Sequence, residues 1–428
     1  MRRTPICTSR ILLTLAALLG LLSLPLPAVA QGDATETVDL EALLLDRQMK
    51  AMRYPIRARI SRYLSKAAEE IDEEKPDEAE ALLLRLDPGR MNPYERALVY
   101  RMLAFISYGN AQPEKAIGYF EQVLGEQVLP LRDESKIRFS VAQLQAGLEN
   151  WAEAIRWVDT WVRYEADPDP VGFYLKAIAQ YQLGEIDAAI ASTLEAISRG
   201  DTPRENWLRL LVALHSEKED FEGAVPYLEE LLLRFPKKQY WIQLALIYGA
   251  REDYNRSLAV QQMAYDQGYL DDDKDLRRFV RSYLYRDLPY PAAKVLEAAL
   301  ENGSVEPDVE AYKMLANSWI AAREYDRALP ALQKAAEMAE DGNLYVRLAQ
   351  VHMQREKWAE ATEMVEKAIE KGDLKDPGKA ELLLGIAHYN NRSPGNARRY
   401  FVRARKYDSS KAEADRWITH LETEFDQG

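Results

Sequence analysis

Cysteine and histidine are scarce in this chain of 428 residues, which holds one cysteine, Cys7, and four histidines. A single thiol cannot form an internal disulfide, and so few cysteines and histidines make a zinc site unexpected. Glycines occur singly rather than in a phosphate-binding loop, and no G-x-S-x-G motif of a serine hydrolase is present. We therefore expect no metal, no cofactor and no catalytic residues, and a protein that is not an enzyme.

Basic residues are outnumbered by acidic ones. The chain has 69 Asp and Glu against 56 Lys and Arg, which gives a formal net charge of −13. Binding to the phosphate backbone of nucleic acid needs a dense basic surface, so a nucleic-acid partner is not expected. Long apolar runs are missing after residue 30, and the sequence predicts no membrane span in the mature chain.

The first thirty residues form the one long apolar exception. Three arginines lie before or at the edge of an apolar run over residues 11–26, and the run leads to an A-x-A site at residues 28–30. A positive start, an apolar middle and an A-x-A end are typical of a secretory signal peptide. We expect residues 1–30 to be cleaved and the protein to be exported. Cleavage would also remove the only cysteine.

The rest of the chain is rich in one repeated pattern. Three examples are WIQLALIYGAREDYNRSLAVQQMA at 241–264, YKMLANSWIAAREYDRALPALQKA at 312–335 and YVRLAQVHMQREKWAEATEMVEKA at 345–368. We number the first aromatic of each unit slot 4, which places two small residues at slots 8 and 20. Slot 20 holds Ala79, Ala116, Ala154, Ala189, Ala224, Ser257, Ala292, Ala328, Ala361 and Ala397. Slot 8 holds Ala67, Ala104, Ala142, Ala177, Val212, Ala245, Val280, Ala316, Ala349 and Gly385.

Small residues at two fixed slots indicate helices that approach each other closely. The pattern is that of the tetratricopeptide repeat (TPR), in which W-x2-L-G-x2-Y is followed by A-x3-F. One helix pair cannot bury its own apolar stripe, so neighbouring pairs must stack. We predict an all-α fold, a TPR α-solenoid that forms a right-handed superhelix of about ten helix-turn-helix repeats over residues 60–407. Residues 31–59 and 408–428 are each expected to supply a terminal capping helix.

The remaining place for function is the concave groove, which the first helix of each repeat lines with slots 2, 5, 9 and 12. These slots give an aromatic N-terminal zone and a basic zone in repeats seven and eight. Exposed aromatic and arginine side chains are enriched at protein interfaces. The candidate protein-binding residues are Arg101, Phe105, Tyr108, Phe139, Gln143, Tyr174, Tyr181, Arg209, Lys274, Arg277, Arg281, Lys313 and Asn317.

Plainer interpretations of these residues stay open. Nearby aspartates could pair Arg277 and Arg281, and the groove could simply be solvated. If the basic zone does face a partner, both arginines are expected to be replaceable without loss of folding. Lys313 and Asn317 match two positions of the carboxylate clamp of some TPR proteins, but the rest of the clamp is not recognisable. Three histidines share slot 11, where a packing ring is expected: His215, His352 and His388.

Strings between the repeats are more specific than the repeat pattern. PKKQYWIQLALIYG at 236–249 and EKGDLKDPGKAELLLGIAHYNN at 370–391 are examples, with NPYERALVY at 92–100 and PYPAAKVLEAALENG at 289–303. Together they resemble the periplasmic TPR protein encoded with TonB-type energy-transduction systems of Gram-negative bacteria. The resemblance implies an accessory scaffold whose partners are periplasmic parts of TonB- or ExbD-like proteins. That complex couples the inner-membrane proton gradient, through its ExbB/ExbD motor, to outer-membrane uptake of iron chelates and similar solutes.

Two other classes of function remain open from the sequence. One is a scaffold for another envelope machine, such as outer-membrane protein assembly or cell-wall synthesis. The other is a cell-wall lytic enzyme with a helical-solenoid body, which would require a catalytic domain that residues 408–428 are too few to provide.

Overall fold

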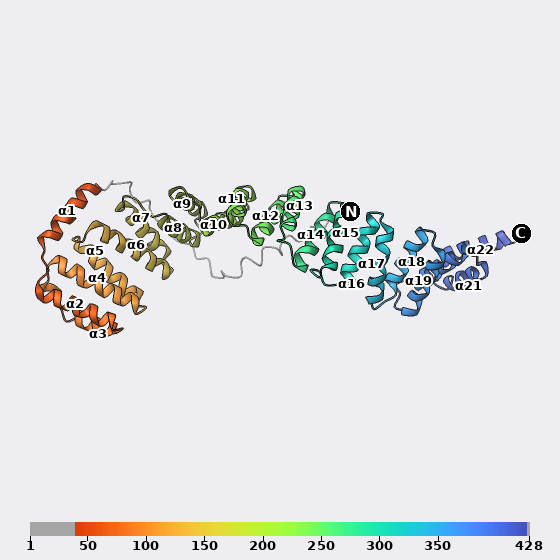
Figure 1. The fold of residues 1–428 in the computed structure, drawn as a ribbon, viewed down its shortest axis with the longest axis horizontal. Coiled ribbons are helices and arrows are strands. Elements are labelled where there is room, and N and C mark those ends of the chain that lie inside the picture. The colour runs from red at the N-terminus through yellow and green to blue at the C-terminus, as the bar shows by residue number, and fades with distance from the viewer. Residues whose placement is uncertain (1–38, 426–428) are drawn as a thin grey trace. The chain divides into compact units, whose positions relative to one another are not determined.

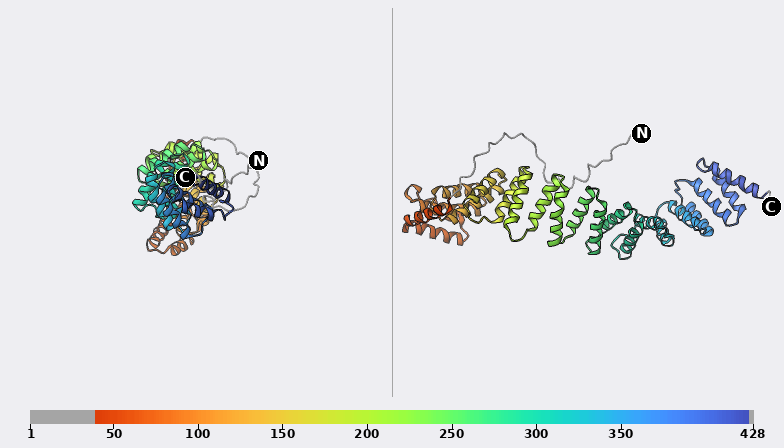
Figure 2. Two further views of the ribbon diagram at one scale, coloured as in Figure 1. Left: turned by 90° about the vertical axis from the view of Figure 1, so that its right-hand side faces the viewer. Right: turned by 90° about the horizontal axis from the view of Figure 1, so that it is seen from above.

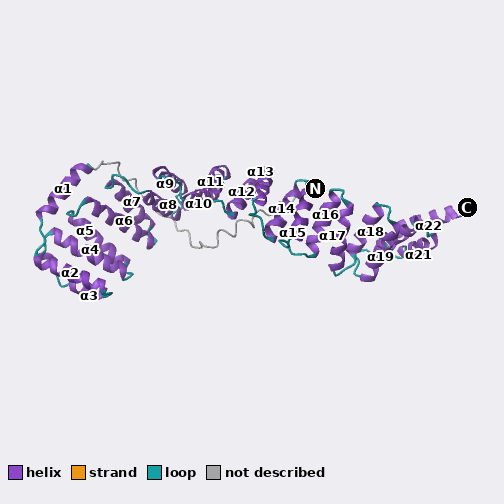
Figure 3. Cartoon of the chain, in the orientation of Figure 1, coloured by secondary structure: helices purple, strands orange, loops and turns teal. Residues whose placement is uncertain are grey.

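The computed structural model describes residues 39–425, and all regular structure in that range is helical (Figures 1 and 3). The predicted signal peptide and residues 31–38 lie outside the described residues. The chain divides into two compact units, Met1–Pro168 and Asp169–Gly428. From α2 onward, the helices of each unit pack against one another in chain order (Figure 2). The predicted all-α solenoid of helix pairs is confirmed.

The first unit contains α1 and three helix pairs, which are repeats one to three. A short 3-10 helix, Pro88–Arg90, lies between the first and second pairs. The helices are α1 (Leu40–Arg53), α2 (Ala58–Asp72), α3 (Pro76–Leu83), α4 (Pro93–Gly109), α5 (Pro113–Glu126), α6 (Leu131–Gly147) and α7 (Trp151–Arg163).

The second unit contains seven further pairs, repeats four to ten, and a final single helix. The pairs are α8 (Pro170–Gln182) with α9 (Ile186–Arg199), α10 (Glu205–Glu217) with α11 (Phe221–Arg234), α12 (Lys238–Ala250) with α13 (Tyr254–Asp266), α14 (Asp273–Tyr285) with α15 (Pro289–Glu301), α16 (Val309–Ala321) with α17 (Tyr325–Met338), α18 (Asn343–Gln354) with α19 (Trp358–Lys371) and α20 (Pro377–Asn390) with α21 (Pro394–Ala404). The final helix is α22 (Lys411–Phe425).

The small residues at slots 8 and 20 lie where the two helices of a pair meet. All twenty are buried, and in repeat ten a Cβ atom added to Gly385 would come within 2.5 Å of the Phe401 ring. Proline at the first position starts seven of the helices, because it needs no N–H donor there. Neighbouring pairs share one core, and in the second unit that core is continuous from Leu208 to Leu384.

The turn inside every repeat has the same backbone conformation. The residue at slot 15 has a φ between +53° and +76° in all ten repeats, although only Gly184 among them is a glycine. In each repeat the N–H of slot 16 donates to the carbonyl of slot 11, as from Asp220 to His215 at 2.9 Å. This is the Schellman arrangement that ends a helix in a left-handed residue. A fixed turn of this kind keeps the pairing of the two helices the same along the chain.

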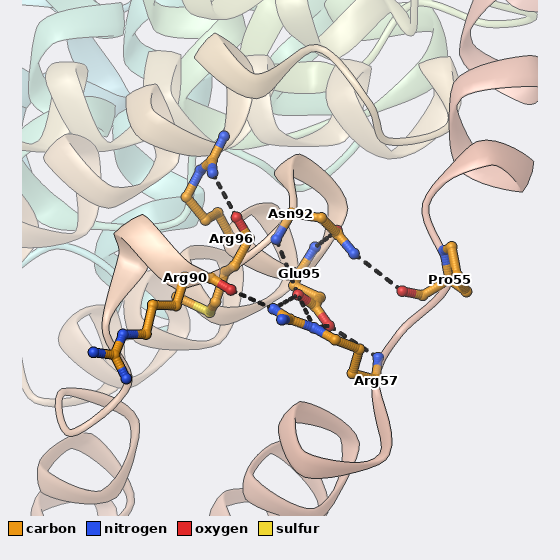
Figure 4. A network of polar contacts seen from close by, with 7 residues as sticks. Pro55, Arg57, Arg90, Asn92, Glu95 and Arg96 are labelled. Atoms are coloured by element: carbon orange, nitrogen blue, oxygen red, sulfur yellow. Dashed lines mark hydrogen bonds and ion pairs between the residues drawn. The ribbon is translucent and has the colours of Figure 1, made fainter.

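The N-terminal segment is held to the repeats by a buried carboxylate, Glu95, in the first turn of α4 (Figure 4). The Arg57 backbone N–H and guanidinium Nε both donate to Glu95 at 2.9 Å, and the Asn92 N–H donates at 3.0 Å. Asn92 Nδ2 also donates to the Pro55 carbonyl at 3.0 Å. The Arg57 hydrogen bond is the main reason that the pKa of Glu95 falls from 4.5 to about 2, against the opposing effect of burial.

The terminal helices differ in what they cover. α22 packs on α20 and α21, with the Trp417 ring stacked on Phe401 at 5.4 Å and Leu421 buried. α1 instead packs against α6 of the third repeat, where Arg47 Nε lies 3.0 Å from Glu134. α1 therefore lies against the third repeat, and its buried arginine pairs with a carboxylate of that repeat. Among the described residues, none of the helices combines the length and apolarity that crossing a bilayer requires.

Candidate functional site

The aromatic zone of the first unit contains an open pocket between repeats two and three. Phe105 and Tyr108 on α4 are 55% and 60% exposed, and the Phe105 ring meets Phe120 edge-on at 5.5 Å. Gln143 on α6 faces the same space, which has a volume of about 390 Å³. The predicted residues Phe105, Tyr108 and Gln143 are thus brought together, although they come from two repeats.

The same pocket has lining residues that the sequence analysis missed. Ser140, Leu144 and Gly147 line it from α6, and Pro113 lines it from the start of α5. The three α6 residues occupy slots 6, 10 and 13, which form a stripe at spacings of four and three next to the predicted one. The glycine at slot 13 of this stripe could have indicated the pocket, because Gly147 leaves space that a larger side chain would fill.

Two other predicted residues of this zone, Phe139 and Arg101, contact neighbouring side chains within the first unit. The Phe139 ring is half-buried against Trp161, with centroids 4.8 Å apart. Arg101 is part-exposed and lies 3.5 Å from Asp133. Neither lines the pocket, so the aromatic surface is narrower than the slot pattern implies.

In the second unit, the side chains of Tyr174 and Tyr181 are also partly buried and form contacts within the fold. Tyr174 packs near Trp207 at 6.0 Å and hydrogen-bonds with Asn206, and burial raises its pKa. Tyr181 hydrogen-bonds with Glu217, and its pKa is raised by burial and then by that carboxylate. Arg209 is exposed.

The basic zone contains one arginine that is not available to a partner. Arg277 is only 9% exposed, and its Nε donates to both carboxylate oxygens of Asp273 at 2.9 Å. Its NH2 group donates to Asp308 at 3.0 Å and to the Glu306 carbonyl at 3.1 Å. The expectation that Arg277 is an exposed groove cation is therefore wrong. It joins the first turn of α14 to the loop before α16.

The other basic residues keep more freedom. Lys274 and Arg281 are exposed, and neither makes an ion pair with the described residues. Lys313 lies 3.3 Å from Glu310 in the same helix. Asn317 is half-buried, and its Oδ1 atom is buried without a hydrogen-bond partner among the described residues. The basic zone is thus Lys274, Arg281 and part of Lys313 rather than four free cations.

The slot-11 histidines behave as packing rings. His215 Nδ1 lies 2.8 Å from Asp220 Oδ2, and its ring lies 5.4 Å from that of Tyr227. His388 stacks on Tyr400 at 5.1 Å, and burial lowers the pKa of both His352 and His388. A search of residues 39–425 finds no group of three potential metal-binding side chains.

Comparison with known families identifies the repeats. Residues 278–343 and 346–411 match the tetratricopeptide repeat family model, and these ranges span repeats seven to ten. These two ranges cover less than half of the chain, and the helix pairs of the remaining repeats are of the same kind, so the fold is a TPR-like α-solenoid. Repeats of this family suggest a protein-interaction scaffold. No protein of curated function matches the chain.

Solved TPR structures cover parts of the chain at low identity. A tetratricopeptide repeat protein from Parabacteroides merdae is 17% identical, with 59% of this chain and 98% of that chain covered and a TM-score of 0.32. YrrB, described as a TPR protein with an unusual peptide-binding site, is 16% identical, with 45% and 96% covered and a TM-score of 0.35. The TPR2AB domain of yeast Sti1, solved with pHSP90, is 15% identical, with 62% and 98% covered and a TM-score of 0.33. None of these likenesses carries an argument about partners.

Proposed function

We propose that this protein is a periplasmic TPR scaffold that serves as an accessory subunit of a TonB-type energy-transduction complex. The observation that carries the scaffold role is the open pocket lined by Phe105, Tyr108 and Gln143, where large aromatic side chains stay exposed on the predicted groove face. Exposed aromatic residues around an apolar pocket are typical anchoring points for a partner chain.

Support for the TonB-type system comes from the inter-repeat strings at 236–249 and 370–391 and from the export signal at residues 1–30. The charge of the chain agrees with this role. TonB-like proteins carry basic, proline-rich periplasmic linkers, and a chain with a net charge of −13 would attract them over several ångströms of solution.

Site-specific crosslinking in the native bacterium tests the proposal. A photo-crosslinking amino acid replaces Tyr108 in the pocket, and the matched control replaces Leu233, which is 77% exposed on α11. We expect crosslinks from position 108, and not from position 233, to the periplasmic part of TonB or ExbD. Crosslinks to outer-membrane assembly or cell-wall synthesis proteins would replace the TonB assignment with the other scaffold role. The absence of any protein adduct at position 108 would refute the pocket as a binding site.

A deletion strain provides the functional half of the test. Loss of the gene should leave the motor proteins at normal levels but impair growth on the iron chelates taken up through the matching TonB-dependent receptor. Normal growth on every such iron source, in a strain without a second TonB system, would refute the accessory role.

A further inference from the structure

Helix α1 leaves an apolar face open to solvent. Leu45, Met49 and Met52 are 59%, 57% and 81% exposed, and their spacing of four and three places them on one side of the helix. That side is opposite Arg47, which is buried against α6. Ile56, just beyond the helix, is also exposed. Leaving such side chains in water costs free energy in proportion to their apolar area.

The open face is fixed in place and does not belong to a loose tail. Arg47 pairs with Glu134, a fully buried carboxylate that also accepts from Arg138 at 3.1 Å. Immediately after α1, Arg57 holds the chain to Glu95, as Figure 4 shows. The first contact lies within the stripe on the opposite side of the helix, and the second follows the stripe in sequence, so Leu45, Met49 and Met52 point away from α6.

The charge around this face is opposite to that of the whole chain. Residues 40–62 contain six cations and two acids, although the protein has a formal net charge of −13. Arg53, Arg59 and Arg62 are exposed and make no ion pair with the described residues, whereas the acid Asp46 is paired with Lys50 at 2.9 Å. Arg59 and Arg62 share a face of α2. Exposed Leu and Met side chains of α1 and exposed guanidinium groups of α1 and α2 are therefore close together in sequence.

We propose that α1 and the start of α2 form a peripheral docking surface for an anionic lipid bilayer. Leu45, Met49 and Met52 would enter the headgroup region to a depth of about 5–10 Å, as interfacial helices do, while the arginines contact lipid phosphates. A second copy of this surface is disfavoured as the occupant, because pairing two of them would bring like charges together. The proposal does not depend on the partner proposed for the pocket.

Vesicle co-sedimentation of the mature protein tests this inference without any protein partner. The vesicles are phosphatidylcholine alone or phosphatidylcholine with phosphatidylglycerol. We expect binding to the anionic vesicles only. The triple variant Leu45→Glu, Met49→Glu, Met52→Glu should lower the partition coefficient by about tenfold or more. Arg59→Glu with Arg62→Glu should also lower it, and this loss should shrink as salt rises.

Two matched variants separate a surface effect from a fold effect. Leu233→Glu places a charge on an exposed leucine of the second unit, and Arg256→Glu with Lys294→Glu makes the same charge change on α13 and α15. Both should bind vesicles as the wild type does, and all variants should melt within a few degrees of it. Wild-type binding by the triple variant, or equal binding to neutral and anionic vesicles, would overturn the proposal. A wild-type dimer that the triple variant splits, with no vesicle binding, would assign the face to a second copy instead.

Discussion

The aromatic zone on α4 and α6 and the basic zone on α14 and α16 occupy equivalent slots but use their central side chains differently. Phe105 and Tyr108 remain exposed beside an open pocket, whereas Arg277 is buried between two aspartates. Other aromatic side chains on this face, such as Phe139 and Tyr174, pack against neighbouring rings. A guanidinium group has five donors and finds carboxylates and carbonyls wherever they lie within reach. Slot position alone therefore does not predict which groove side chains stay exposed, since Lys274 and Arg281 do so beside the buried Arg277.

The largest effect that separates the two zones concerns the stability contributed by Arg277. Arg277→Met should lower the free energy of unfolding by about 2 kcal/mol, less than the loss for a fully buried pair because both aspartates stay about half-exposed. The variant leaves Asp273 and Asp308 near each other without their shared cation. Urea denaturation followed by circular dichroism measures the change.

The matched control is Arg281→Met, four residues further along the same helix and exposed. It should change the unfolding free energy by no more than about 0.5 kcal/mol. Equal effects of the two substitutions would mean that Arg277 is not a structural residue, and Arg277 would then count again among the cations of the basic zone.

The second prediction concerns Glu95, the buried carboxylate that holds the N-terminal segment in the first unit. Its pKa is about 2 in the folded protein and 4.5 ordinarily, so ionised Glu95 stabilises the fold above pH 4.5, and this contribution is lost as the pH falls toward 2. The contribution is roughly 1–3 kcal/mol after allowance for the partly exposed Arg57. Thermal melting from pH 7 to pH 2 should show Glu95→Gln less stable than wild type at neutral pH.

The difference between Glu95→Gln and wild type should close as the pH approaches 2, where the wild-type carboxyl also gains a proton. Glu69→Gln, a change at an exposed glutamate of α2, should follow the wild-type curve at every pH. A constant gap between Glu95→Gln and wild type across the pH range would show that the loss is steric and does not come from the ionised group.

The sequence predicts the features of this fold that repeat, because the same requirement recurs ten times. The slot 8 and slot 20 residues are buried as their size demands, and the slot-11 histidines pack against neighbouring side chains. The turn at slot 15 is just as regular. Its residues are mostly Glu, Arg and Asp, however, and unlike glycine these residue types do not indicate a positive φ in the sequence. Backbone hydrogen bonds enforce that conformation regardless of side-chain type.

Features that occur once are harder to predict. The pairing of Arg47 with Glu134 joins residues 87 positions apart, and no periodicity relates them. Arg277 has one nearby candidate partner in the sequence, Asp273, whereas Asp308 is 31 residues away and only the fold brings it to 3.0 Å. In the pocket, Phe105 and Tyr108 could be predicted from their slots, whereas Pro113 could not, because it starts a helix on the other side of a turn.

The third prediction tests the aromatic zone as the binding surface. Phe105→Ala and Tyr108→Ala should each weaken binding of the co-encoded periplasmic TonB or ExbD domain by about 1–2 kcal/mol, which is typical of an anchoring aromatic residue. Tyr108→Ala should leave the melting temperature unchanged, because that ring is 60% exposed. Calorimetric titration measures the affinity, with Leu233→Ala as an exposed apolar control. Unchanged affinity in both aromatic variants would show that the pocket is not used.

The smallest expected effect belongs to the two cations that remain free in the basic zone. Lys274 and Arg281 lie seven residues apart on the same face of α14, about two turns along the helix. Exposed charges of this kind contribute only about 0–1 kcal/mol each, but they steer an approaching acidic segment and so act mainly on the association rate. Lys274→Glu with Arg281→Glu should therefore slow association with the same periplasmic domains at low salt while leaving dissociation nearly unchanged.

The control, Arg256→Glu with Lys294→Glu, makes the same change in net charge on the second helices of repeats six and seven. At ~1 M salt the Debye length is ~3 Å, and the two double variants should then associate at the same rate. If they already do so at low salt, the pair acts only through net charge, and the aromatic pocket alone remains as the binding surface.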